Sequence, residues 1–114
     1  MMRYIAIILL APILIVFPDD ANSQVDWWPM FHHDLNHTGY STSIAPNTNQ
    51  VSWSYRTGHG MNSSPAVADG KVYVGSWDDN VYCLDALNGD SIWSYTTGGN
   101  VSSSPAVDDG KVYV

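Results

Sequence analysis

The sequence predicts an all-β fold of four-stranded antiparallel propeller blades, of which about one and a half are present, preceded by a signal-peptide helix. The first observation behind this prediction is an internal repeat with a period of 40 residues. The second is a series of hairpin-turn signals between short runs rich in β-branched and aromatic residues. The third is that no segment after Gln24 has the apolar periodicity of a helix. The composition agrees, because all eleven acidic residues are Asp, which favours turns over helices.

Residues 1–23 have the pattern of a secretory signal peptide. Arg3 supplies a positive start, and residues 5–17 are an uncharged apolar run, IAIILLAPILIVF. This run is shorter than the roughly 20 apolar residues that span a membrane. Ala21 and Ser23 are small residues at the −3 and −1 positions of a cleavage site after Ser23. An uncleaved N-terminal membrane anchor is the alternative. Both interpretations predict export, to the periplasm, the extracellular space or the cell envelope.

The repeat organises the rest of the chain. Residues 53–74 read WSYRTGHGMNSSPAVADGKVYV and residues 93–114 read WSYTTGGNVSSSPAVDDGKVYV, with sixteen of 22 positions identical. We therefore divide the chain into a pre-blade segment, residues 24–50, and a repeat region, residues 51–114. The repeat region holds a first repeat, 53–92, and a second, 93–114. The second repeat stops at Val114, which aligns with Val74, so we expect the chain to be an incomplete piece of a longer propeller.

Within the first repeat, the pattern predicts strands separated by tight turns. Asp69-Gly70 is a type I′ hairpin signal, because both central residues of that turn need a positive φ, and Asp109-Gly110 repeats it. Asp78-Asp79-Asn80 and Asn88-Gly89 are the next two turns. The predicted strands cover residues 64–68, 71–76, 81–85 and 91–97. Four such strands in about 40 residues are typical of one propeller blade.

The stretch SSPAVADGKVYVGSWDDNVYCLDALNGDSIWSY, residues 63–95, resembles the pyrroloquinoline-quinone-like (PQQ-like) repeat propellers. The tryptophan-docking motif of that family is similar to A-x-D-x-x-T-G-x-x-x-W. Asp85, Gly89 and Trp93 match it, whereas Cys83 and Asn88 replace the common Ala and Thr. The stretch WWPMFHHDLNHTGYS, residues 27–41, looks like the segment that precedes the first blade in exported members.

One large side chain recurs in each repeat, at Trp53 and Trp93. Both faces of a four-stranded blade expose apolar residues, so neighbouring blades must stack on them, and these tryptophans are expected to seal the joints. A WD40 propeller is the competing interpretation, because the period is 40 and Trp77-Asp78 is a WD dipeptide. That dipeptide lies in a turn here, and the Gly58-His59 signal is lost in the second repeat.

Four groups of residues invite a chemical interpretation. His32, His33, Asp34 and His37 have metal-binding side chains, but no helical run places them on one face. Asp78, Asp79 and Asn80 lack the Gly and the distal Glu of a calcium loop. Cys83 is expected in a buried strand, where a Cys acts as a small hydrophobe. Ser63, Ser64, Ser103 and Ser104 occur in both repeats, which indicates a structural role rather than a nucleophile.

We therefore expect no catalytic, cofactor-binding or metal-binding residue in this chain. The expected function is an exported binding or scaffold module of the cell envelope. The alternatives are the N-terminal part of a quinone-dependent dehydrogenase, the only case that implies PQQ and calcium, and a carbohydrate- or surface-binding propeller. Expected partners are further blades of the same protein, envelope proteins or surface ligands. A net charge of −7 with four Lys and Arg residues argues against nucleic acid.

Overall fold

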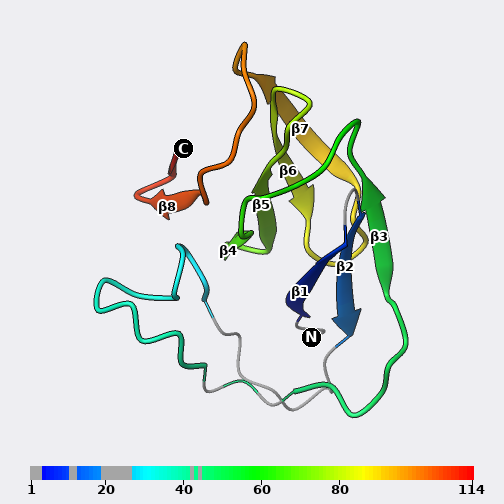
Figure 1. Ribbon diagram of the computed structural model, residues 1–114. Helices are drawn as coiled ribbons and strands as arrows, with labels where there is room; N and C mark the ends of the chain where they lie inside the picture. Colours follow the sequence, from blue (N-terminus) through cyan, green and yellow to red (C-terminus); the bar gives the residue numbers. More distant parts are fainter. Residues whose placement is uncertain (1–3, 11–12, 19–26, 42, 44) are drawn as a thin grey trace.

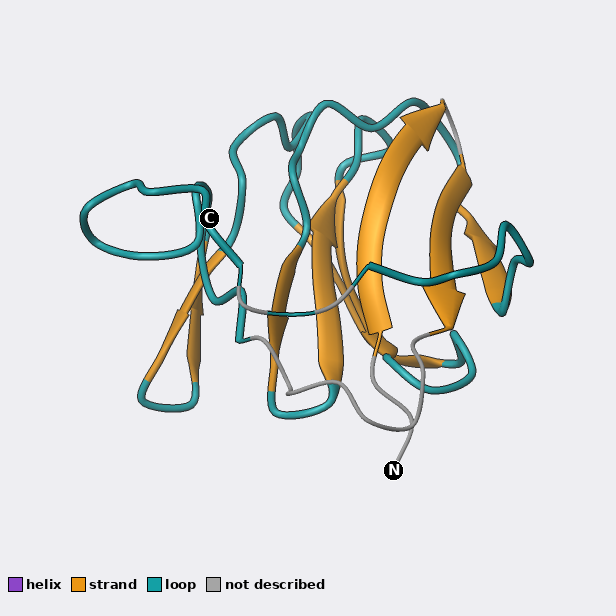
Figure 2. Cartoon of the chain, turned by 90° about the horizontal axis from the view of Figure 1, so that it is seen from below, coloured by secondary structure: helices purple, strands orange, loops and turns teal. Residues whose placement is uncertain are grey.

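The computed structural model describes residues 4–10, 13–18, 27–41, 43 and 45–114, and the secondary structure in this part of the chain is β. Within these residues, nine strands form three antiparallel sheets, in the orders β1-β2-β3, β4-β5-β6-β7 and β8-β9. The strands are β1 (Tyr4–Leu10), β2 (Ile13–Pro18), β3 (Trp53–Arg56), β4 (Ala66–Ala68), β5 (Lys71–Gly75), β6 (Asn80–Asp85), β7 (Ser91–Thr96), β8 (Ala106–Asp108) and β9 (Lys111–Tyr113). The all-β prediction is thus confirmed, and the three sheets lie side by side like blades (Figure 1, Figure 2).

The four-stranded sheet β4–β7 is the complete blade that the repeat predicted. Its first hairpin turns at Asp69 and Gly70, whose φ angles of 50° and 70° are both positive, as a type I′ turn requires. This turn pairs Val67 with Val72, so residues of the two strands alternate between the two faces of the sheet. The same residues recur at Asp109 and Gly110 between β8 and β9, with φ angles of 46° and 70°.

The two faces of the complete blade bury separate apolar clusters. One cluster packs the blade against β3 and the loop after it, and the other packs the blade against β8. The first consists of Trp53, Met61, Val72, Val74, Leu84 and Ala86. The second consists of Ala66, Ala68, Tyr73, Cys83 and Val107. Neighbouring residues such as Tyr73 and Val74 enter different clusters, because successive side chains of a strand point to opposite faces.

In its described residues, 5–10 and 13–17, the apolar N-terminal run is extended, whereas the sequence predicted a helix. β1 and β2 form a hairpin, and β2 pairs with β3 in the antiparallel direction. The run is rich in β-branched Ile and Val, and the edge of β3 offers it backbone hydrogen-bonding groups, so strand pairing satisfies both segments. The rest of the predicted signal peptide, including Ser23, lies outside the described residues. Among the residues described, no helix is long and apolar enough to cross a membrane.

The pre-blade segment crosses the first strands of two consecutive blades. Trp28 forms an isolated antiparallel bridge with Val67 of β4, with hydrogen bonds of 3.0 and 2.7 Å. The amide of Val107 in β8 donates to the Pro29 carbonyl at 2.7 Å. This short stretch of chain therefore links β4 to β8 from outside both sheets, and it fixes the position of the loop that follows it.

Candidate functional site

The joint between β3 and the complete blade is built around the Trp53 indole. Its Nε1–H donates to the Ala86 carbonyl at 3.0 Å, so the polar atom of this buried side chain is satisfied. The indole lies flat against Gly89, where a Cβ atom would come within 2.6 Å of Cδ2. Gly89 also has a φ of 76°, which only glycine adopts without strain. The close contact and the backbone conformation therefore both require glycine at this position.

Asp85 shapes the turn that presents Gly89 to the indole. Its Oδ1 accepts hydrogen bonds from the amides of Leu87, at 2.7 Å, and Asn88, at 3.3 Å. Its backbone carbonyl accepts from the Gly89 amide at 2.9 Å. A short carboxylate bonded to amides two and three residues further on forms an Asx turn. Asp85, Gly89 and Trp53 thus form one unit, although Trp53 comes 32 residues before Asp85.

Trp93 occupies the equivalent position in the second repeat, but its surroundings differ. Its relative exposure is 39%, against 8% for Trp53. Its ring lies beside Tyr73, with centroids 6.0 Å apart. The whole of β7, which carries Trp93, is exposed. The prediction that a tryptophan seals the joint describes Trp53; the positions 40 residues after Ala86 and Gly89, which would face Trp93, lie beyond Val114.

A second inter-blade contact is made by Asp78, at the start of the turn before β6. Its Oδ2 accepts from the Gly58 amide and from the Tyr82 hydroxyl, both at 2.7 Å. Its Oδ1 accepts from the Asn80 amide at 3.2 Å. Gly58 follows β3 and Tyr82 is in β6, so a single carboxylate connects the two blades. We call this arrangement the Asp78 latch.

The hydrogen bonds of the Asp78 latch shift the acidities of two groups in opposite directions. Burial alone would raise the pKa of Asp78. The hydrogen bonds from Tyr82, Gly58, Asn80 and Ser76 outweigh it and hold that pKa below its usual value. Burial and the neighbouring Asp78 carboxylate raise the pKa of Tyr82 to about 12. The Asp78 carboxylate is therefore ionised and the Tyr82 phenol protonated at neutral pH, the forms that make this hydrogen bond.

Trp77 lies at the same end of the blades, between two loops that differ between the repeats. Its Nε1–H donates to Ser102 Oγ at 2.9 Å, and its ring is stacked on His59, with centroids 6.1 Å apart. Its amide donates to the Gly60 carbonyl. His59 and Ser102, at variable positions of the two repeats, thus both contact the Trp77 side chain. Trp77 therefore connects the two variable loops.

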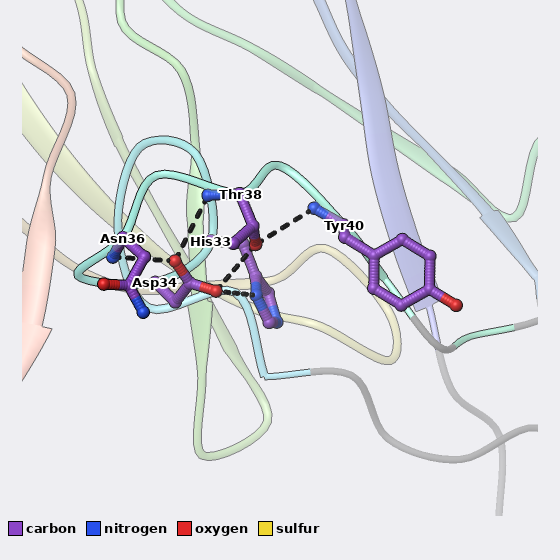
Figure 3. A network of polar contacts seen from close by, with 5 residues as sticks. All are labelled: His33, Asp34, Asn36, Thr38 and Tyr40. Carbon is purple, nitrogen blue, oxygen red and sulfur yellow. Dashed lines mark hydrogen bonds and ion pairs between the residues drawn. The ribbon is translucent and has the colours of Figure 1, made fainter.

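The pre-blade segment carries a compact polar loop around Asp34 (Figure 3). Asp34 Oδ1 accepts from the Asn36 amide at 2.9 Å, and Oδ2 accepts from the Thr38 hydroxyl at 2.6 Å. His33 Nδ1 lies 3.5 Å from Oδ2. The hydrogen bonds from Thr38, side chain first and then backbone, lower the pKa of Asp34 to about 2. The loop is thereby closed around an ionised carboxylate.

The other chemical candidates have structural surroundings. His32 and His37 face each other at 5.9 Å, but within the described residues no three His, Cys, Asp or Glu side chains are grouped to hold a metal ion. Cys83 is buried, which raises the pKa of its thiol. Of the repeated serines, Ser63 Oγ accepts from the Gly75 amide at 3.1 Å, and Ser104 Oγ accepts from the Ser64 amide at 2.9 Å. The second of these hydrogen bonds joins the two repeats.

Two of these contacts were not predicted from the sequence. The Asp78 latch was interpreted only as part of a solvated turn, although the glycine that it binds is present in both repeats, as Gly58 and Gly98. That repetition was the available signal. The bridge from Trp28 to Val67 joins residues far apart in the sequence, and no local pattern indicated it.

Consecutive antiparallel blades, related by a 40-residue repeat and stacked through apolar clusters, define a β-propeller repeat protein. Residues 38–114 match a family model of PQQ-like repeats described as outer membrane protein assembly factor BamB. Because this match spans more than half of the chain, the chain belongs to that family of PQQ-like repeat proteins. No curated protein matches the chain.

Proposed function

We propose that this chain is a binding or scaffold part of an exported β-propeller of the cell envelope, with the pre-blade segment as its contact surface. The observation that carries the proposal is a group of exposed apolar side chains on that segment. Leu35 is 87% exposed, and Phe31, Trp27 and Tyr40 are also exposed. Large apolar side chains gathered on one exposed segment are typical of a protein-binding surface.

Two sets of contacts hold the segment that carries these side chains in place. The Asp34 hydrogen bonds close the loop, and the contacts of Trp28 and Pro29 attach it to two blades. A surface fixed in this way loses little conformational freedom on binding, which favours affinity. The description of the family, an outer membrane protein assembly factor, supports an envelope protein as the partner.

Site-specific photo-cross-linking in intact cells tests this proposal. A photoreactive amino acid replaces Leu35 in the protein expressed with residues 1–23. The matched control replaces Leu87, which is exposed on the turn after β6. We expect adducts with an envelope protein from position 35 and none from position 87. Equal adducts from both positions, or none from position 35, would contradict the proposed surface.

Export is tested by N-terminal sequencing of the exported form. We expect the mature protein to begin at Gln24.

The dehydrogenase alternative is tested separately by calorimetric titration with pyrroloquinoline quinone in the presence of calcium. The arrangement of Asp78 and Asp79 favours a structural role, because Asp78 already accepts hydrogen bonds from Gly58 and Tyr82. We expect no binding heat. Saturable binding that is lost in Asp78→Asn would instead favour the dehydrogenase.

A further inference from the structure

β3 is equivalent in sequence to β7, the fourth strand of the complete blade. The described residues just before β3 hold no repeat copy of β4, β5 and β6. Trp53–Arg56 aligns with Trp93–Thr96, and β7 is the last strand of the sheet β4-β5-β6-β7. In the described residues between Trp27 and Trp53, the only strand-like pairing is the bridge from Trp28 to Val67. Among the described residues, the strand that pairs with β3 is β2.

The N-terminal hairpin pairs with β3 in the antiparallel direction, on four residues equivalent to those that β7 uses to pair with β6. Val16 pairs with Trp53 and Leu14 with Tyr55. In the complete blade, Cys83 pairs with Trp93 and Val81 with Tyr95. β3 and β7 are equivalent under the 40-residue repeat, so β2 lies beside β3 where β6 lies beside β7. β1 then lies on the far side of β2, as β5 lies on the far side of β6 (Figure 1).

The apolar run suits this role physically. Without β2, one edge of β3 would present unpaired amide and carbonyl groups, which attract strands of other molecules. Six of the thirteen residues from 5 to 17 are Ile or Val, the side chains that strands favour. The same run therefore has the composition of a blade strand as well as that of a signal-peptide core.

We propose that β1 and β2 are a removable strand donor, which adds strands to β3 and keeps other strands from its edge while the N-terminus is attached. The site on β3 accepts an apolar extended segment in the position that β6 takes beside β7. This inference rests on the antiparallel pairing of β2 with β3 and does not require the proposed export or the proposed contact surface. Loss of residues 1–23 would free the edge for another blade strand.

Disulfide trapping in the full chain tests the register. Ile15 and Ser54 are direct partners, and Ser54 is exposed, so Ile15→Cys with Ser54→Cys places two thiols on the same side of the sheet. The matched control, Leu14→Cys with Ser54→Cys, places them on opposite sides. We expect the first pair to form a disulfide under mild oxidation and the second to remain reduced. Equal oxidation of both pairs, or none of either, would overturn the proposal.

Hydrogen exchange tests the protection of the edge. Ile15→Pro removes a backbone donor from the strand next to β3, whereas Ile8→Pro makes the same change in β1, which does not contact β3 in the pairing. We expect Ile15→Pro to speed exchange of the amides of residues 53–56 by at least about tenfold, and Ile8→Pro to leave them nearly unchanged. The same exchange rates in both variants would show that β2 does not protect β3.

Discussion

Trp53 and Trp93 have the same neighbours in sequence and different neighbours in space. Both begin the sequence Trp-Ser-Tyr, yet Trp53 is 8% exposed and Trp93 is 39% exposed. Trp53 is covered because Gly89 and the Ala86 carbonyl lie against it, whereas the positions 40 residues further on, which would face Trp93, lie beyond Val114. The difference shows that the turn of the adjacent blade, rather than the strand that carries the tryptophan, decides whether the indole contributes to stability.

The largest expected effect is on Trp53. Trp53→Ala removes a buried indole and is expected to lower the free energy of unfolding by ~3–5 kcal/mol. Trp93→Ala removes a partly exposed side chain and is expected to cost only ~1–2 kcal/mol. Urea unfolding followed by far-UV circular dichroism measures both. Equal losses would show that the difference in exposure does not control the two contributions.

The next effect tests the surface against which Trp53 packs. Gly89→Ala places a methyl group on the indole and forces a left-handed backbone on alanine, so we expect a loss of ~2–5 kcal/mol. Gly98→Ala is the matched control, because Gly98 also has a positive φ, of 87°, but has open space around it. Its expected loss is only the ~1–2 kcal/mol of the backbone. Similar losses of stability in the two variants would show that the close contact between Gly89 and the indole does not contribute to the effect.

The Asp78 latch is expected to give a smaller effect that depends on pH. Asp78→Asn weakens the hydrogen bonds to Gly58 and Tyr82 and should cost ~1–2 kcal/mol at pH 7. Because the folded pKa of Asp78 lies below its unfolded value, its contribution is present above the unfolded pKa. It is lost as the pH falls through the folded pKa.

The matched control for the Asp78 latch is Asp69→Asn, in an exposed turn where Asn tolerates a positive φ. Urea unfolding at pH 7 and at a series of falling pH values should show that Asp78→Asn and the wild type converge as the pH falls through the folded pKa of Asp78. A difference between them that persists in acid would contradict the ionised latch.

The smallest expected effect is local, at the Asp34 loop. The Thr38 hydroxyl is the main cause of the low pKa of Asp34, about 2, so Thr38→Val should move this pKa toward its ordinary value of 3.8. Titration of the Asp34 carboxyl carbon by nuclear magnetic resonance measures the change. The blades should be unaffected, because the backbone hydrogen bonds that attach this segment to β4 and β8 come from Trp28 and Pro29, outside the Asp34 loop. An unchanged pKa in Thr38→Val would assign the shift to other groups.

The local rules of turns and strands were sufficient to predict the complete blade. Asp69-Gly70 fixed a hairpin, because few other residue pairs adopt two successive positive φ angles. β4 nevertheless begins at Ala66 rather than Ser64, since the residues before it make loop contacts, such as that between Ser64 and Ser104. The sequence pattern did not indicate the residue at which β4 begins to form hydrogen bonds with β5.

The sequence by itself determined the repeat, the order of the strands and the side chains available at each joint, because these depend on local backbone preference and on periodicity. Only the tertiary structure decided that Gly89 covers Trp53, that Asp78 bonds to the previous blade, and that β2 extends along β3. Each of these depends on the distance between residues far apart in the chain. An apolar run of Ile, Leu and Val suits a helix in lipid and a strand on a free edge alike, so its neighbour selects the conformation.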